Sequence, residues 1–354
     1  MVFAVLGFSS LISFIPKKEN KKFFLLISFA VLFVFAALRY NYGNDYSSYN
    51  EFFDTVKMGG RIAGINEIGY RYLNQIFPSF QLLIAFISLV FLFAIYKVIV
   101  TSVEPELYPL ALFIFIINPY LFLMSLSMIR ESIAIILFIL AVYFASKKRI
   151  LLFVGAVALA SLFHASAILV LPAYFLCNEK NFLKKKEWIL LVIPVVLLLL
   201  YDSYISGWIV KLLEYFKNPN YIYYFENTNS NSLRATLLTS ISFVYVCLNF
   251  NKLTGKKLMF SKLALIALMI DILGFKIPMV GRIGKYFAYF SIVAIPSIFI
   301  YNLKNEKGWR KFLFGYVFPL VILTVYLLRV YSFFANPTWK SFLEYHFFEF
   351  GVSL

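Results

Sequence analysis

Charged and phenolic side chains stand beside long apolar runs at five places in the sequence. At the first of these, residues 38–49, Arg39 could bind a phosphate and Asp45 could accept a proton. Tyr46 and Tyr49 could offer flat faces on which sugar rings stack. The alternative is that these aromatic residues anchor the chain at a membrane surface, around an Asx turn.

The second and third places combine a carboxylate with an arginine. Glu67 and Arg71 stand four residues apart with Tyr70 between them, so a salt bridge along one helix explains them as well as a functional role does. Arg130 opens an apolar run in which the only other charge is Glu131. A charge in such a position favours a functional role.

A histidine and a cationic helix face occupy the last two places. His164 lies among apolar residues, where a hydrogen-bonded structural histidine is the more common explanation, and two histidines in the chain are too few for a His-rich metal site. Arg282, Lys285, Tyr286 and Tyr289 follow the spacing of one helix face. They would suit a diphosphate, although a snorkelling lysine within an aromatic belt gives the same pattern.

Several sequence motifs of soluble enzymes are absent. No Walker loop, GxGxxG or HExxH occurs, which argues against ATP hydrolysis, dinucleotide binding and zinc proteolysis. Asp-x-Asp, the usual metal and nucleotide-sugar site of soluble glycosyltransferases, is also missing. We therefore expect neither a metal nor a cofactor.

The composition indicates which elements must position these groups. Of 354 residues, 62% are hydrophobic and only 14% are charged, against about 25% charged in soluble domains. The chain is therefore predicted to be a polytopic all-α membrane protein with a single domain over 1–354. Its first residues are interpreted as a short span and not as a signal peptide. Twelve apolar segments are predicted: 2–16, 23–38, 80–97, 107–124, 129–146, 151–163, 164–177, 187–203, 235–250, 263–280, 285–303 and 312–331.

The net charge of +16 indicates an orientation in the membrane. Lysine and arginine clusters fall in alternate gaps between the apolar segments, which marks those gaps as cytoplasmic. Both termini and the long polar loops 39–79 and 204–234 then lie outside. Within these loops, segments 45–75 and 208–225 are predicted to be amphipathic helices on the outer leaflet. The membrane topology explains the positive net charge, so this charge does not imply a nucleic-acid partner.

A hairpin of short helices is predicted between the cytoplasmic residues Arg149 and Lys180. The apolar stretch between them must cross an even number of times, yet each half reaches only ~20 Å, which is short of a ~30 Å hydrocarbon core. Other helices must shield such a hairpin. His164 lies at its apex.

Taken together, the five places resemble the EpsG-like family of exopolysaccharide proteins. Residues 43–49 resemble its G-T-D-Y-x-x-Y element, Glu67–Tyr70 its Glu-x-Gly-Tyr, and residues 127–134 its Ser-x-x-Arg-Gln-x-x-Ala. Phe-His-x-Ser-Ala and a late Gly-Arg-x-x-x-Tyr follow in the same order, at 163–167 and at 281–286. The chain departs from the family with Asn44 in place of Thr and Glu131 in place of Gln.

The resemblance implies a Wzy-type polymerase of surface polysaccharide with a helical fold of the type-C glycosyltransferase kind. The donor and acceptor would be oligosaccharide repeat units on undecaprenyl diphosphate, joined at the outer face of the bacterial cytoplasmic membrane. The resemblance also implies that the active site faces the periplasm or the outside and that the protein contacts membrane lipids. A chain-length regulator is implied as a further partner.

This reaction gives each candidate residue a role. Fixed cations must stabilise the leaving diphosphate, and we assign Arg130 and Arg282 first, then Arg39 and Lys285. Asp45, Glu67 and His164 compete as the general base. The predicted sugar-binding residues are Tyr46, Tyr49, Tyr70 and Tyr286.

Two alternatives share many of these features. A flippase of lipid-linked oligosaccharide would have the same spans and outer cations, but the sequence shows no inverted repeat and its polar groups concentrate on one side. A membrane O-acyltransferase of surface sugars would need an acyl donor from the cytoplasm, where the loops are short and offer no catalytic residue beyond scattered glutamates.

Overall fold

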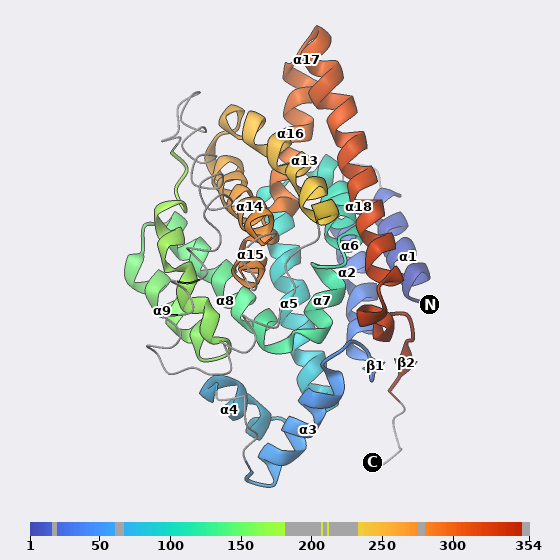
Figure 1. Cartoon of the computed structure of the whole chain (residues 1–354), viewed down its shortest axis with the longest axis vertical. Coiled ribbons are helices and arrows are strands. Elements are labelled where there is room, and N and C mark those ends of the chain that lie inside the picture. The colour runs from blue at the N-terminus through green and yellow to red at the C-terminus, as the bar shows by residue number, and fades with distance from the viewer. Residues whose placement is uncertain are drawn as a thin grey trace. The chain divides into compact units, whose positions relative to one another are not determined.

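The computed structural model describes residues 1–15, 20–60, 67–180, 207, 211, 233–274 and 280–348 (Figure 1). Most of these residues are helical, and the strands among them are two short segments, β1 (Arg39–Tyr40) and β2 (His346–Phe347). The predicted all-α class is therefore confirmed.

The chain divides into two compact units. The first contains Met1–Tyr174 and Tyr326–Leu354, and the second contains Phe175–Val325. A single membrane domain over the whole chain stays a prediction. The elements that begin in the first unit are α1 (Val2–Phe14), α2 (Lys21–Ala37), β1, α3 (Tyr46–Lys57), α4 (Ile68–Ile76), α5 (Phe80–Ser102), η2 (Pro105–Leu107), α6 (Tyr108–Ile117), α7 (Phe122–Ser127), α8 (Ile129–Ser146), α9 (Ile150–Ser161), η3 (Ala165–Phe175), η6 (Pro337–Phe342) and β2.

The second unit is a smaller set of helices. Its elements are α13 (Leu233–Asn249), η4 (Phe250–Lys252), α14 (Gly255–Leu273), α15 (Gly281–Ala288), α16 (Ser291–Asn305), α17 (Gly308–Phe312), the π-helical turn η5 (Leu313–Val317) and the start of α18 (Phe318–Ala335). The α14 helix packs against α13, α15 and α16.

Three helical stretches of the described chain are long and apolar enough to cross a membrane, namely 80–102, 129–146 and 308–335. A fourth is possible if α15 and α16 form one span, although these helices meet at an angle of 57°. The chain is thus a helical membrane protein by length and composition, while the twelve-span topology stays a prediction.

Several predicted segments differ from the structure in detail. The segment 107–124 is broken at Asn118 and Pro119 into α6 and α7, because proline cannot continue the hydrogen-bond ladder of a helix. The segment predicted as one helix over 285–303 is divided between α15 and α16. The structure describes no residue of the predicted apolar segment 187–203, and of the predicted amphipathic segment 208–225 it describes residue 211 alone.

The predicted hairpin around His164 is present as two short helices, α9 and η3. The ring of Phe153 in α9 lies 5.3 Å from that of Tyr174 in η3, so the chain folds back on itself. His164 stands in the turn between the helices and is buried.

The amphipathic segment 45–75 forms α3 and α4, as predicted. The apolar face of α3 is buried in a cluster with residues of α4, α5 and α8, and this aromatic core contains Tyr46, Tyr49, Phe52, Phe53, Val56, Tyr70, Phe80, Leu83, Ile84, Ile87 and Ile129. The burial of these aromatic rings contributes much of the free energy that holds α3 and α4 against α5 and α8. Their position on the outer leaflet stays a prediction.

Arg39 joins three helices of the first unit. Only 1% of this residue is exposed. Its guanidinium donates hydrogen bonds to the carbonyl of Ala36 at the end of α2, to Ser88 Oγ in α5 at 2.9 Å, and to the carbonyl of Leu126 in α7 at 3.3 Å. A charge this deeply buried requires such partners, so Arg39 links α2, α5 and α7.

The C-terminal segment closes over the same region. β2 pairs antiparallel with β1, with Arg39 opposite Phe347 and Tyr40 opposite His346. Directly before β2, the Tyr345 hydroxyl donates a hydrogen bond to the backbone carbonyl of Phe35 in α2 at 2.6 Å. Residues about 300 positions apart in sequence therefore fix the start of the loop that leads to Asp45.

We predict that Arg39→Met lowers the thermal melting temperature of the detergent-purified protein by about 4–10 °C, because Ser88 and two carbonyl oxygens lose a buried donor. The control is Arg149→Met, which changes an exposed arginine of the same unit. Equal melting temperatures of the Arg39→Met and Arg149→Met variants would show that the Arg39 hydrogen bonds contribute little to the stability of the protein.

Candidate functional site

Four of the five sequence motifs meet in the first unit. We call this meeting point the motif junction and define it as residues 43–49, 67–70, 127–130 and 162–164. Hydrogen bonds join each segment to another, across sequence separations of up to about 100 residues. Figure 1 shows α3 and α4 beside each other at one end of α5.

The first contact of the motif junction joins the Asp45 loop to Ser127. The backbone N–H of Asp45 donates to Ser127 Oγ at 3.1 Å. Gly43 has φ of +90°, and a Cβ on it would lie 3.1 Å from Ser127 Cβ. Only glycine adopts this conformation readily and leaves room for Ser127, so the glycine of the motif fixes the position of Asp45.

An ion pair between Arg130 and Glu67 forms the second contact. Arg130 Nη1 lies 2.6 Å from Glu67 Oε2, and the two side chains are 19% and 14% exposed. A pair that is mostly shielded from water is stronger than a surface pair, yet its remaining exposure lets a ligand reach it.

Tyr49 holds the other side of the arginine. Arg130 Nε donates to the Tyr49 hydroxyl at 3.3 Å, and the guanidinium carbon lies 5.7 Å from the centre of the Tyr49 ring. The ring of Tyr49 in turn packs edge-on against Tyr70 at 5.6 Å. Arg130 has five N–H donors, and two of them are used by partners within the described residues.

Burial of these phenols affects their charge. It raises the pKa of Tyr49 and of Tyr70 well above the usual value, although the charge of Arg130 acts in the opposite direction. Both hydroxyls are therefore neutral at physiological pH. They can position Arg130 by hydrogen bonding and packing, but they supply no negative charge to it.

The last contact brings in the hairpin that carries His164. The N–H of Gly69 in α4 donates to the carbonyl of Leu162 at 2.9 Å, and a Cβ on Gly69 would lie only 3.0 Å from that oxygen. Phe163 packs against the aromatic core. The segment with Glu67 and the turn with His164 are therefore neighbours.

The structure corrects three expectations about these residues. The Glu67–Arg71 salt bridge is absent from the described contacts, because Glu67 binds Arg130 and Arg71 Nη2 donates to the carbonyl of Gly60 at 3.1 Å. Arg39 is buried among protein acceptors and does not face a ligand. The rings of Tyr46, Tyr49 and Tyr70 are buried against other aromatic rings, so in this structure they belong to the core beneath the site.

The fifth motif lies in the second unit, on α15. Arg282 and Lys285 are half-buried, while Tyr286 is completely buried. Gly284 lies between them against Ile270 of α14, where a Cβ would come within 3.0 Å of the isoleucine side chain. The cations thus sit on a short helix that is packed closely onto α14.

A comparison with protein-family models matches the EpsG family over residues 3–347, nearly the whole chain. The chain belongs to the EpsG family. No curated protein and no solved structure matches it. Membership of the EpsG family suggests that this chain is a polysaccharide-related polymerase of the glycosyltransferase type and that it lies in a membrane.

Three polar residues that support the site of this EpsG-family protein had no assigned role in the sequence. Ser127 accepts from the Asp45 backbone, and Gln81 donates to the carbonyl of Arg39 at 3.3 Å while accepting from the Tyr46 hydroxyl. Asn44 donates to the carbonyl of Thr338 in the C-terminal segment at 2.9 Å. Gln81, a polar residue near the start of an apolar span, could have been found from sequence, but the partner of Asn44 could not.

We predict that Gly69→Ala reduces polymer formation, because the added methyl group would meet the carbonyl of Leu162 at 3.0 Å and push α4 away from the hairpin. Gly155→Ala is the matched control, since a Cβ at this helical glycine of α9 meets nothing within 4 Å. Polymer length on a gel, at equal protein levels, measures the effect. Normal polymer in Gly69→Ala would show that the close contact is not needed for activity.

Proposed function

We propose that this protein polymerises oligosaccharide repeat units carried on undecaprenyl diphosphate, at the outer face of the bacterial cytoplasmic membrane. The observation that carries the proposal is the mostly shielded Arg130–Glu67 pair, which lies beside the neutral Tyr49 and in the same junction as the Asp45 loop. A glycosyl transfer from a lipid diphosphate needs a fixed cation and a general base, and the motif junction holds candidates for both.

Arg130 stabilises the leaving group in this scheme. As the acceptor oxygen forms its bond to the anomeric carbon, the bond from that carbon to the diphosphate oxygen breaks, and the electron pair stays on the diphosphate. A guanidinium already fixed by Tyr49 binds the developing charge without first having to reorganise. Arg282 and Lys285, on α15 of the second unit, stay predicted diphosphate ligands.

The carboxylate of Glu67 has two roles in turn. At rest it neutralises Arg130 at 2.6 Å. When the diphosphate binds Arg130, Glu67 loses its partner and can accept the proton of the acceptor hydroxyl. Asp45 and His164 are the other candidates for this proton, and Asp45 orients the acceptor if Glu67 is the base.

The surroundings of the reaction complete the proposal. The chain adopts a type-C glycosyltransferase-like fold with about twelve spans, the motif junction faces the periplasm or the outside, and membrane lipids bring both substrates to it. A chain-length regulator would be a further partner. The scheme uses no metal or cofactor.

We predict that Arg130→Ala reduces polymer formation by at least about 10²-fold, because a preorganised donor at a developing charge contributes that much to turnover. Arg130→Lys should restore little, since a point charge does not reproduce the planar guanidinium that bonds both Glu67 and Tyr49. A surface-polysaccharide gel of a gene-deletion strain carrying each variant measures the effect. Arg149→Ala, a change at an exposed arginine, is the control.

The same gel separates the alternatives. Single repeat units on the surface after deletion support a polymerase. Complete loss of surface saccharide would point to a flippase, and unchanged length with altered decoration would point to an O-acyltransferase. Normal polymer in Arg130→Ala would contradict the assigned role of the arginine.

A further inference from the structure

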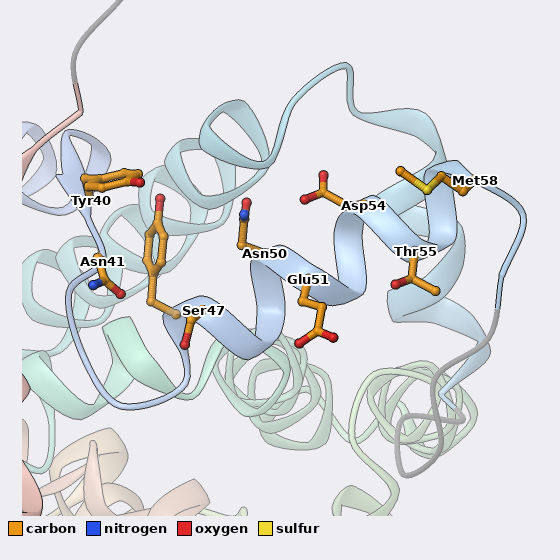
Figure 2. A pocket seen from close by; sticks show the side chains of 9 residues that line it. Tyr40, Asn41, Ser47, Asn50, Glu51, Asp54, Thr55 and Met58 are labelled. Atoms are coloured by element: carbon orange, nitrogen blue, oxygen red, sulfur yellow. The ribbon is translucent and has the colours of Figure 1, made fainter. Parts of the chain in front are cut away.

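A groove runs along the outward face of α3, on the side of the helix away from the aromatic core. It has a volume of about 470 Å³ and is lined by Tyr40, Asn41, Tyr46, Ser47, Asn50, Glu51, Asp54, Thr55 and Met58. Figure 2 shows Asn50 and Asp54 projecting from one edge of α3 and Ser47, Glu51 and Thr55 from the neighbouring edge, with Tyr40 and Met58 at opposite ends. Tyr46, one of the predicted sugar-binding residues, contributes to the lining, whereas the other lining residues have no role assigned above.

The lining has the chemistry of a saccharide site. Two amides, two aliphatic hydroxyls and two carboxylates offer both donors and acceptors along the groove, which matches the density of hydroxyl groups on a sugar chain. The half-buried ring of Tyr40 closes one end, where a sugar face can pack against it. An apolar lipid tail would leave most of these groups without partners and is disfavoured.

The charge of the lining limits which saccharides the groove can bind. Glu51 and Asp54 are acidic, and no lining residue is cationic. The only cation of α3, Lys57, lies outside the lining and donates to the carbonyl of Gln75 at 2.8 Å. Phosphate groups and uronic acids would be repelled here, whereas neutral sugars and amino sugars would not.

The groove is also suitably placed for an acceptor. Along α3 its exposed polar lining starts at Ser47, two residues after Asp45, and α3 carries Tyr49, the partner of Arg130, on its other face. From Ser47 to Met58 the helix rises by about 16 Å, which suits a short oligosaccharide better than a single sugar. A chain lying in the groove would therefore bring its end to the Asp45 side of the motif junction.

We propose that this groove binds the acceptor saccharide, and that it selects a neutral or amino-sugar chain over an anionic one. The inference rests on the proposed polymerase function and adds the substrate class to it.

Saturation-transfer NMR on the detergent-purified full chain at low salt tests the proposal. The probes are three tetrasaccharides: one of N-acetylglucosamine, one of glucosamine and one of hyaluronan type, which carries uronates. We expect the first two to bind and the third to bind at least about tenfold more weakly. Asp54→Lys should weaken glucosamine-tetramer binding at least about fivefold and remove the discrimination against the uronate probe. Glu344→Lys, a change at an exposed carboxylate outside the groove, should bind like the wild type.

Three results would overturn the proposal: no binding of any probe, equal or tighter binding of the uronate probe, or unchanged binding in Asp54→Lys. The polysaccharide gel keeps this failure separate from that of the polymerase function. If Arg130→Ala stops polymer while Asp54→Lys and Tyr40→Ala leave polymer and binding unchanged, the groove inference fails and the proposed function stands. If Arg130→Ala makes normal polymer, the proposed function fails, and the acceptor role of the groove fails with it.

Discussion

The 2.6 Å ion pair between Arg130 and Glu67 is the interaction around which the first unit is organised. A guanidinium at the start of an apolar helix is costly unless it has partners, and here the partners come from α3 and from the N-cap of α4. Each partner needs its own support. The ring of Tyr49 is fixed by the aromatic core, and the position of Glu67 depends on the close contact between Gly69 and the hairpin turn.

A second layer of buried polar contacts keeps the Asp45 loop in place. Arg39 ties the end of α2 to α5 and α7, and the C-terminal strand β2 pairs with the strand that contains Arg39. The loop that follows is then held by Ser127 on one side and by the C-terminal segment on the other. The site thus consists of short irregular segments whose geometry is set by the apolar helices around them. Such an arrangement lets a helical membrane protein hold polar groups without exposing unpaired backbone to lipid.

Local patterns in the sequence predicted much of the fold. The apolar run 129–146 became α8 with the same bounds, and the two short halves around His164 became α9 and η3. Hydropathy and helix length determine such elements locally. The break between α15 and α16 was missed because the apolar run continues across it without a proline at the bend.

The partners of the polar residues were harder to predict. The nearest basic residue to Glu67 on a helix is Arg71, and only tertiary packing brings Arg130, 63 positions away, to the carboxylate instead. Likewise, nothing local distinguishes Arg39, which is buried among carbonyls, from Arg130, which keeps access to a ligand. The four tyrosines were predicted to bind sugar from their type, yet the packing of α3 and α4 onto α5 buries three of them in the core.

The account depends on the claim that diphosphate binding takes Arg130 from Glu67 and frees the carboxylate. Glu67→Gln tests this claim, because the amide keeps the shape of the side chain but removes the charge that competes for Arg130. The measurement is the affinity of the purified variant for undecaprenyl diphosphate, together with its rate of polymer formation. The account predicts binding that is as tight as in the wild type or tighter, with turnover lower by about 10²-fold or more. Weaker diphosphate binding with normal turnover would contradict it.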